Sequence, residues 1–279
     1  MGVDAMQFSV PRDFHPGALD RHLPLGKLPG VPVFGDVYRV LPESEWLEAI
    51  RDPNRPQMSK QVWSINDQDG NGSCASEAAH GGCKLVRALS GREKVETNPL
   101  GTYGRVNGGS DRDSSLSANI AHVTKHGCFP ESVWPRSKGW RAEPTDAAYE
   151  AASHYKLHES YDCDDSSESR FFAELFSAVL MGPFPTEFGY PGHAILAVEI
   201  LEAEKAPPEA VKCADAVDRW ILKKGYTMGD NPTGLVNDLL VMYLNSWHES
   251  WGWNGFGYLR ASRIQRSYGA FPMRAMVEA

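Results

Sequence analysis

The pattern of apolar and polar residues changes near Gly192, about two thirds of the way along the chain. Before this point, apolar residues recur mainly at helical spacing. The pattern predicts helices over residues 44–51 (with Ser44 as the cap), 74–89, 116–126 and 169–180. Residues 102–115 have the composition of a loop, and the proline-rich first 60 residues predict little other regular structure.

After Gly192 the chain contains short runs rich in β-branched and aromatic residues, bounded by glycine. These runs predict strands over residues 193–201, 238–247 and 256–261. Between the first two, residues 207–225 begin with proline and end with glycine, the asymmetry typical of a helix. The order of elements therefore predicts an α+β fold, helical first and then mostly sheet.

Composition and charge narrow the class of protein. The chain has 279 residues, 42% hydrophobic and 23% charged, which suits one large domain or two lobes. The net charge is −8 and no basic cluster exceeds the pair Lys223–Lys224, so no nucleic-acid partner is expected. We expect no membrane partner and no export, because the chain lacks a long apolar stretch and the features of a signal peptide.

Five scattered cysteines, an odd number without a C-x-x-C pair, predict a reducing compartment. We therefore expect a location in the cytoplasm or in another non-secreted setting, a larger particle included. Neither a cofactor nor a metal is expected. The pairs His122/His126 and His154/His158 share helical spacing but lack a nearby third ligand, so we interpret them as solvated helix faces.

The stretch NDQDGNGSCASE, residues 66–77, permits two interpretations. Its run D-x-D-x-N-G, starting at Asp67, matches the opening of an EF-hand calcium loop. The twelfth position of such a loop requires a bidentate carboxylate, and here it is Ala78. The prolines at residues 53 and 56 also interrupt the helix that should precede the loop. The calcium interpretation is therefore disfavoured.

The alternative is a thiol nucleophile, Cys74, at the start of the helix 74–89. A helix N-terminus favours a thiolate, which also needs a histidine base and an orienting polar group. His193 and Asn245, at the edges of predicted strands, suit these roles. Gln68 could donate to an oxyanion together with the backbone N–H of Cys74.

These residues lie in motifs that resemble the papain-like cysteine proteases. Q-D-G-N-G-S-C-A, ending at Ala75, resembles Q-G-x-C-G-S-C-W, and H-A-I-L-A-V resembles H-A-x-x-A-V. N-S-W-H-E-S-W-G, from Asn245, resembles N-S-W-G-x-x-W-G. The resemblance runs from about residue 57 to the end and implies two lobes, one helical and one an antiparallel, barrel-like β lobe, with the active site in the cleft between. It implies four catalytic residues, Cys74, His193, Asn245 and Gln68, and a substrate site that includes Ser73, Gly108, Gly109 and Trp247.

Several departures from the family pattern affect these expectations. Asn71 and Val106 stand where the family has two half-cystines, and His248 replaces a glycine. Residues 202–238 look like an inserted helical excursion. We therefore expect an N-terminal extension over 1–56 and a catalytic domain over 57–279, with lobes over about 57–165 and 166–279. The extension does not resemble the family's inhibitory prosegment, so no conventional zymogen is expected.

The sequence thus predicts thiol-dependent hydrolysis of a peptide or protein substrate. A second hypothesis is a papain-like fold with a structural or scaffolding role in a larger particle, with the 202–238 insertion or the N-terminal extension as the surface for an assembly partner. Acyl transfer would use the same catalytic residues.

Overall fold

The computed structural model describes residues 18–19, 31–55, 57–111, 113–182, 184–224 and 234–274. Its main sheet has six strands in the described residues, in the order β3-β8-β4-β5-β6-β7, and every neighbouring pair is antiparallel. The strands are β3 (Glu159–Ser160), β4 (Thr186–Tyr190), β5 (His193–Glu202), β6 (Leu239–Leu244), β7 (Phe256–Arg260) and β8 (Ala270–Arg274). A short parallel pairing joins β1 (Ala18–Leu19) to β2 (Ser114–Ser115).

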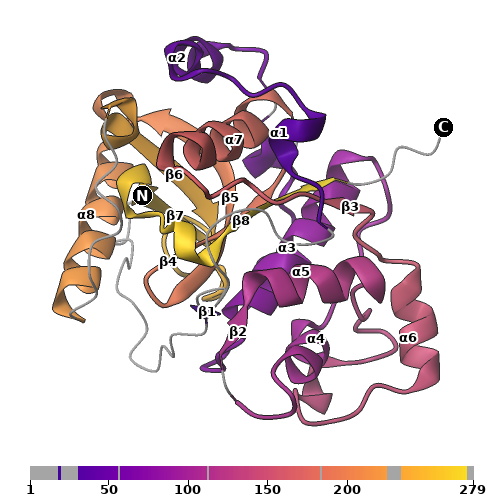
Figure 1. Ribbon diagram of the computed structural model, residues 1–279. Coiled ribbons are helices and arrows are strands. Elements are labelled where there is room, and N and C mark those ends of the chain that lie inside the picture. The colour runs from indigo at the N-terminus through magenta and orange to yellow at the C-terminus, as the bar shows by residue number, and fades with distance from the viewer. Residues whose placement is uncertain are drawn as a thin grey trace.

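The helices lie on several sides of this sheet. In Figure 1, α4, α5 and α6 lie together on one side, whereas α8 lies at the opposite side. The α-helices are α1 (Phe34–Val37), α2 (Glu43–Arg51), α3 (Cys74–Leu89), α4 (Pro99–Val106), α5 (Leu116–Lys125), α6 (Asp146–Ser153), α7 (Glu168–Met181) and α8 (Pro208–Lys223). Short 3-10 helices are Met58–Gln61, Arg136–Lys138, Ala203–Lys205, Gly234–Asp238, Ala261–Arg263 and Arg266–Tyr268. Within the described ranges, no helix has the length and apolarity to cross a lipid bilayer.

Helix α3 lies at the centre of the molecule, as the burial of all its residues from Cys74 to Val86 shows. It contacts β5 of the sheet on one side and α5 on another. The glycine pair within it permits this packing, since a Cβ on Gly82 would collide with the side chain of Met273 in β8. The predicted helix over 74–89 is confirmed, and it joins the helical part to the sheet.

Residues 31–55 pack against the sheet part of the molecule. Trp46 and Ile50 of α2 belong to the main hydrophobic core. Arg51 donates two hydrogen bonds, of 2.8 and 2.7 Å, to the carboxylate of Glu202 at the end of β5. The predicted helix over 44–51 is present, but it begins at Glu43, so Ser44 lies inside it and Pro42 occupies the cap position.

Two parts of the sequence-based assignment were wrong or incomplete. The predicted loop over 102–115 contains most of α4 and all of β2. Helix α4 begins at Pro99, and the side chain of Asn98 accepts a 3.0 Å hydrogen bond from Leu100 N–H. This start signal lies before the glycine-rich stretch that suggested a loop. Strand β4, before Gly192, and helix α6 were not predicted.

Candidate active site

Cys74 is the first residue of α3, and its thiol is fully buried. The backbone N–H groups of Ala194 and Ala75 lie near the sulfur and lower the pKa of the thiol. Ala194 directly follows His193, so the thiol lies against the start of β5. Burial raises the pKa of Cys74 to about 12, and the Ala194 N–H opposes that rise. Both N–H groups, together with the N-terminal end of the helix, favour the thiolate once it forms.

His193 is the first residue of β5, and Asn245 directly follows the neighbouring strand β6. His193 Nε2 lies 2.8 Å from Asn245 Oδ1, which also accepts a 2.8 Å hydrogen bond from Ser246 N–H. Because Oδ1 accepts, Nε2 carries the proton in this pair. Burial lowers the pKa of His193 to about 4, and the hydrogen bond to Asn245 opposes that change.

Trp247 covers the imidazole of His193. The two rings are stacked, with centroids 4.7 Å apart and planes inclined by 21°. Trp251 in turn packs edge-on against Trp247 at 5.0 Å. Trp247 is buried, so it separates the histidine from solvent on this face. The stacking gives Trp247 a shielding position over His193, whereas the resemblance implied a part in the substrate site.

Gln68 is fixed at both ends of its amide. Its oxygen accepts hydrogen bonds from Ser246 Oγ at 2.9 Å and from Trp247 Nε1 at 3.1 Å. Its nitrogen donates to the carbonyl of Asn71 at 2.8 Å. An amide nitrogen carries two hydrogens, so this bond leaves a second one to donate to an oxyanion. The loop that carries Gln68 is therefore tied directly to the Asn245–Trp247 segment.

Polar contacts hold the loop of residues 66–73, before Cys74, where the family pattern has a disulfide. Gly72 N–H donates to Asp111 Oδ1 at 3.4 Å, and the hydroxyl of Tyr103 donates to the same oxygen at 2.6 Å. Arg136 donates to Glu77 Oε1 at 2.7 Å and to the carbonyl of Asp67. No motif in the sequence signals the roles of Asp111, Arg136 or Glu77, because each joins segments that are distant in the chain.

The expected substrate-binding residues lie in different settings. Gly108 and Gly109 form the turn after α4 with φ of 69° and 76°, and a Cβ on either would enter open space. Ser73 is buried, and its hydroxyl donates to Glu77 Oε1 at 3.2 Å. The Ser73 side chain therefore supports the helix start, and its carbonyl accepts a 2.9 Å hydrogen bond from Glu77 N–H.

The stretch that suggested calcium has other contacts here. Asn71 Nδ2 donates to the carbonyl of Gln68 at 2.8 Å, which braces the loop from within. His122 and His126 lie with ring centroids 4.9 Å apart. No group of three His, Cys, Asp or Glu side chains suited to a metal ion occurs in the ranges that the structure describes.

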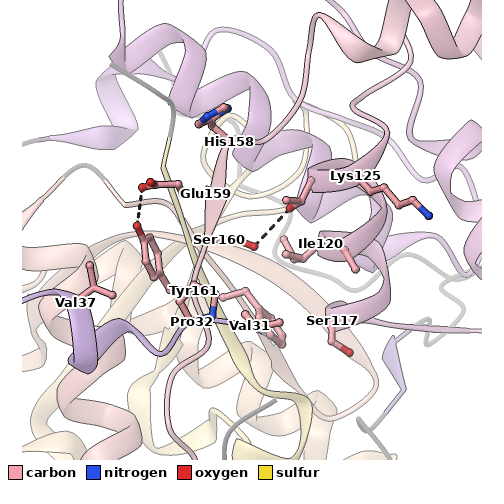
Figure 2. Close-up of a pocket in the computed structure, with 13 residues that line it drawn as sticks. Val31, Pro32, Val37, Ser117, Ile120, Lys125, His158, Glu159, Ser160 and Tyr161 are labelled. Carbon is pink, nitrogen blue, oxygen red and sulfur yellow. Dashed lines mark hydrogen bonds between the residues drawn. The ribbon is translucent and has the colours of Figure 1, made fainter. Parts of the chain in front are cut away.

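A separate hollow of about 590 Å³ lies between α5 and β3. Figure 2 shows Ile120 and Lys125 from α5 on one side of it and Glu159, Ser160 and Tyr161 on the other. None of the four expected catalytic residues lines it. The hollow is therefore separate from the Cys74–His193 region.

The comparisons with known proteins bear on the fold. A comparison with the models of protein families finds no match, and neither does one with curated proteins. Among solved structures, xylellain, a cysteine protease from Xylella fastidiosa, is similar at TM-score 0.55 and 17% identity over 90% of this chain and 96% of that one.

Two further solved structures are similar. The proform of the ragweed cysteine protease Amb a 11 matches at TM-score 0.54 and 15% identity, over 83% of this chain and 70% of its own. A stem bromelain precursor matches at TM-score 0.56 and 11% identity, over 90% of this chain and 78% of its own. The chain therefore has the two-lobed, papain-like α+β fold expected from its motifs.

Proposed function

We propose that the protein hydrolyses peptide bonds, with Cys74 as the nucleophile, His193 as the base and Asn245 as the group that orients the base. One observation carries the proposal. His193 Nε2 is bound to Asn245 Oδ1 at 2.8 Å, and the next residue along β5, Ala194, lies against the Cys74 thiol. The first contact is the one that a base and its orienting group require, and the second brings the thiol to the start of the strand that carries the base.

The chemistry follows from these contacts. Because Nε2 is committed to Asn245, the other nitrogen, Nδ1, accepts the proton of the Cys74 thiol. The thiolate attacks the substrate carbonyl, and the backbone N–H of Cys74 and the amide of Gln68 stabilise the oxyanion. The imidazolium then protonates the leaving amine, and water hydrolyses the thioester. Both Cys74 and His193 are fully buried, so a peptide reaches them only after the surrounding chain moves aside.

Hydrolysis of a quenched fluorogenic peptide library tests the proposal. We expect cleavage by the wild type and none by Cys74→Ser, with unchanged circular dichroism and thermal midpoint. Cys83→Ser is the matched control, because Cys83 lies on the same helix and is also buried. Equal rates for wild type and Cys74→Ser would refute the assignment of the nucleophile.

A further inference from the structure

A second feature of the site lies beside Asn245, on the side away from His193 Nε2. Here the structure contains a small cavity, within which the centre of a water molecule can move through about 10 Å³. Its walls include Glu77 and Gly81 of α3, Ala194 of β5, and Leu244 and Asn245. A space of this size suits one water molecule, provided that polar groups face it.

Two buried polar atoms belong to residues in the walls of this cavity. Glu77 Oε2 and Asn245 Nδ2 have no hydrogen-bond partner within the described part of the chain. The carboxylate can only accept, and the amide nitrogen can only donate. A water molecule between them would accept from Asn245 and donate to Glu77. Such a bridge would satisfy both atoms, which are costly to leave unpaired in a buried site.

We propose that one buried water molecule bridges Asn245 Nδ2 and Glu77 Oε2, and that Glu77 is thereby a positioning residue for His193. Its catalytic consequence rests on the proposed function. The water donates one hydrogen to Glu77 and accepts a hydrogen bond from Asn245 Nδ2, which holds the amide with Nδ2 towards the water and Oδ1 towards His193. A flipped amide would turn Nδ2 towards the Nε2–H of His193 and would lose the hydrogen bonds that Oδ1 accepts from His193 and Ser246.

The surroundings of Glu77 support this role. Its other oxygen, Oε1, accepts hydrogen bonds from Arg136 at 2.7 Å and from Ser73 at 3.2 Å, which directs Oε2 away from both. Burial raises the pKa of Glu77 to about 7, and the charges of Arg136 and Lys84 oppose that rise. The carboxylate therefore gains a proton as the pH falls through about 7. A protonated carboxyl is a weaker acceptor than a carboxylate, so the hydrogen bond from the water weakens and Asn245 is held less firmly.

Glu77→Gln removes the charge while keeping the side-chain volume. We expect kcat/KM above neutral pH to fall by roughly tenfold, mainly through kcat, because one orienting hydrogen bond is weakened. We also expect the ionisation near pH 7 to disappear from the profile of kcat/KM against pH. A residue with a purely structural role would lower the thermal midpoint without changing the shape of that profile.

Gly81→Ala tests the water independently of the charge. The added Cβ would lie 3.6 Å from Leu244 and 3.8 Å from Leu196, which are ordinary contacts, and it would occupy the cavity. Alanine is also a better helix former than glycine. We expect this variant to be at least as stable as the wild type and about tenfold slower. A faster or unchanged rate would overturn the proposal.

A high-resolution crystal structure of Cys74→Ser at alkaline pH provides a readout that does not depend on activity. We expect a water within hydrogen-bonding distance of Glu77 and Asn245, and none in Gly81→Ala. If that position holds no water in Cys74→Ser, the proposed bridge is wrong even when the wild type cleaves peptides. If the water is present but the wild type never cleaves peptides, the bridge stands and the proposed function fails.

Discussion

Glu187, in the middle of β4, offers a test of how burial controls charge in this protein. Its side chain is fully buried, and neither carboxylate oxygen has a hydrogen-bond partner in the residues that the structure describes. Burial raises its pKa well above the ordinary value of 4.5, and the nearby Cys83 adds to that rise. We therefore expect Glu187 to bind its proton more tightly in the folded protein than in the unfolded chain.

The sign of the pH dependence follows from proton binding. Above pH 4.5 the unfolded chain releases the Glu187 proton, whereas the folded chain keeps it up to the raised pKa. The free energy of unfolding therefore falls as the pH rises, by about 1.4 kcal/mol for each pH unit.

Urea unfolding measures this effect. It compares the Cys74→Ser parent with the double variant that carries Cys74→Ser and Glu187→Gln. We expect the variant to gain stability relative to the parent as the pH rises above 4.5, by at most about 1.4 kcal/mol for each pH unit. Glu174→Gln is a matched control, because Glu174 is equally buried but accepts hydrogen bonds from Arg170 and from Asp164 N–H. It should be destabilised by about 1–3 kcal/mol. Parallel pH curves for the parent and Glu187→Gln would refute the reasoning.

Three further predictions concern the site and the fold. Asn245→Ala should lower kcat by roughly 10²-fold with an unchanged fold, because His193 loses the partner at Nε2 that orients it; a rate equal to wild type would contradict this. Gly104→Ala should destabilise the protein by about 2 kcal/mol or more in urea unfolding, since a Cβ there collides with the carbonyl of Trp140. The control Gly108→Ala should cost only about 1 kcal/mol, because its Cβ enters open space and only the positive φ is unfavourable. Intact mass spectrometry of the purified protein should show no processing of the N-terminal extension, and a shortened N-terminus would contradict the expectation of no conventional zymogen.

The sequence predicted the long, periodic elements well. Helix 74–89 was predicted with the bounds that the structure shows, and the helix within 207–225 corresponds to α8. Helix 74–89 contains a continuous buried stretch, and the helix within 207–225 has a proline as its start signal and a glycine as its stop signal. Strand β4 was missed because its buried Glu187 and its neighbouring prolines and glycines contradict a strand pattern. Helix α4 was missed because its two glycines permit close packing that no local pattern reveals.

The residues of the candidate site also fall into those that the sequence could predict and those that it could not. Cys74, His193 and Asn245 could be proposed from sequence because each stands in a short, distinctive motif. Glu77 and Arg136 could not, because their pairing joins α3 to a 3-10 helix through a contact between residues 59 positions apart. The roles of such residues depend on burial and on the direction of single atoms. These properties arise only once the tertiary structure has formed.

Labelling with a thiol-directed epoxide inhibitor tests the central claim most directly. The wild type would be incubated with the inhibitor, digested and mapped by mass spectrometry over its five cysteines. We expect one label per molecule, on Cys74, and we expect Asn245→Ala to slow its attachment. Labelling at any of the other four cysteines in preference to Cys74, or no labelling of the folded wild type, would contradict the assignment of Cys74 as the nucleophile.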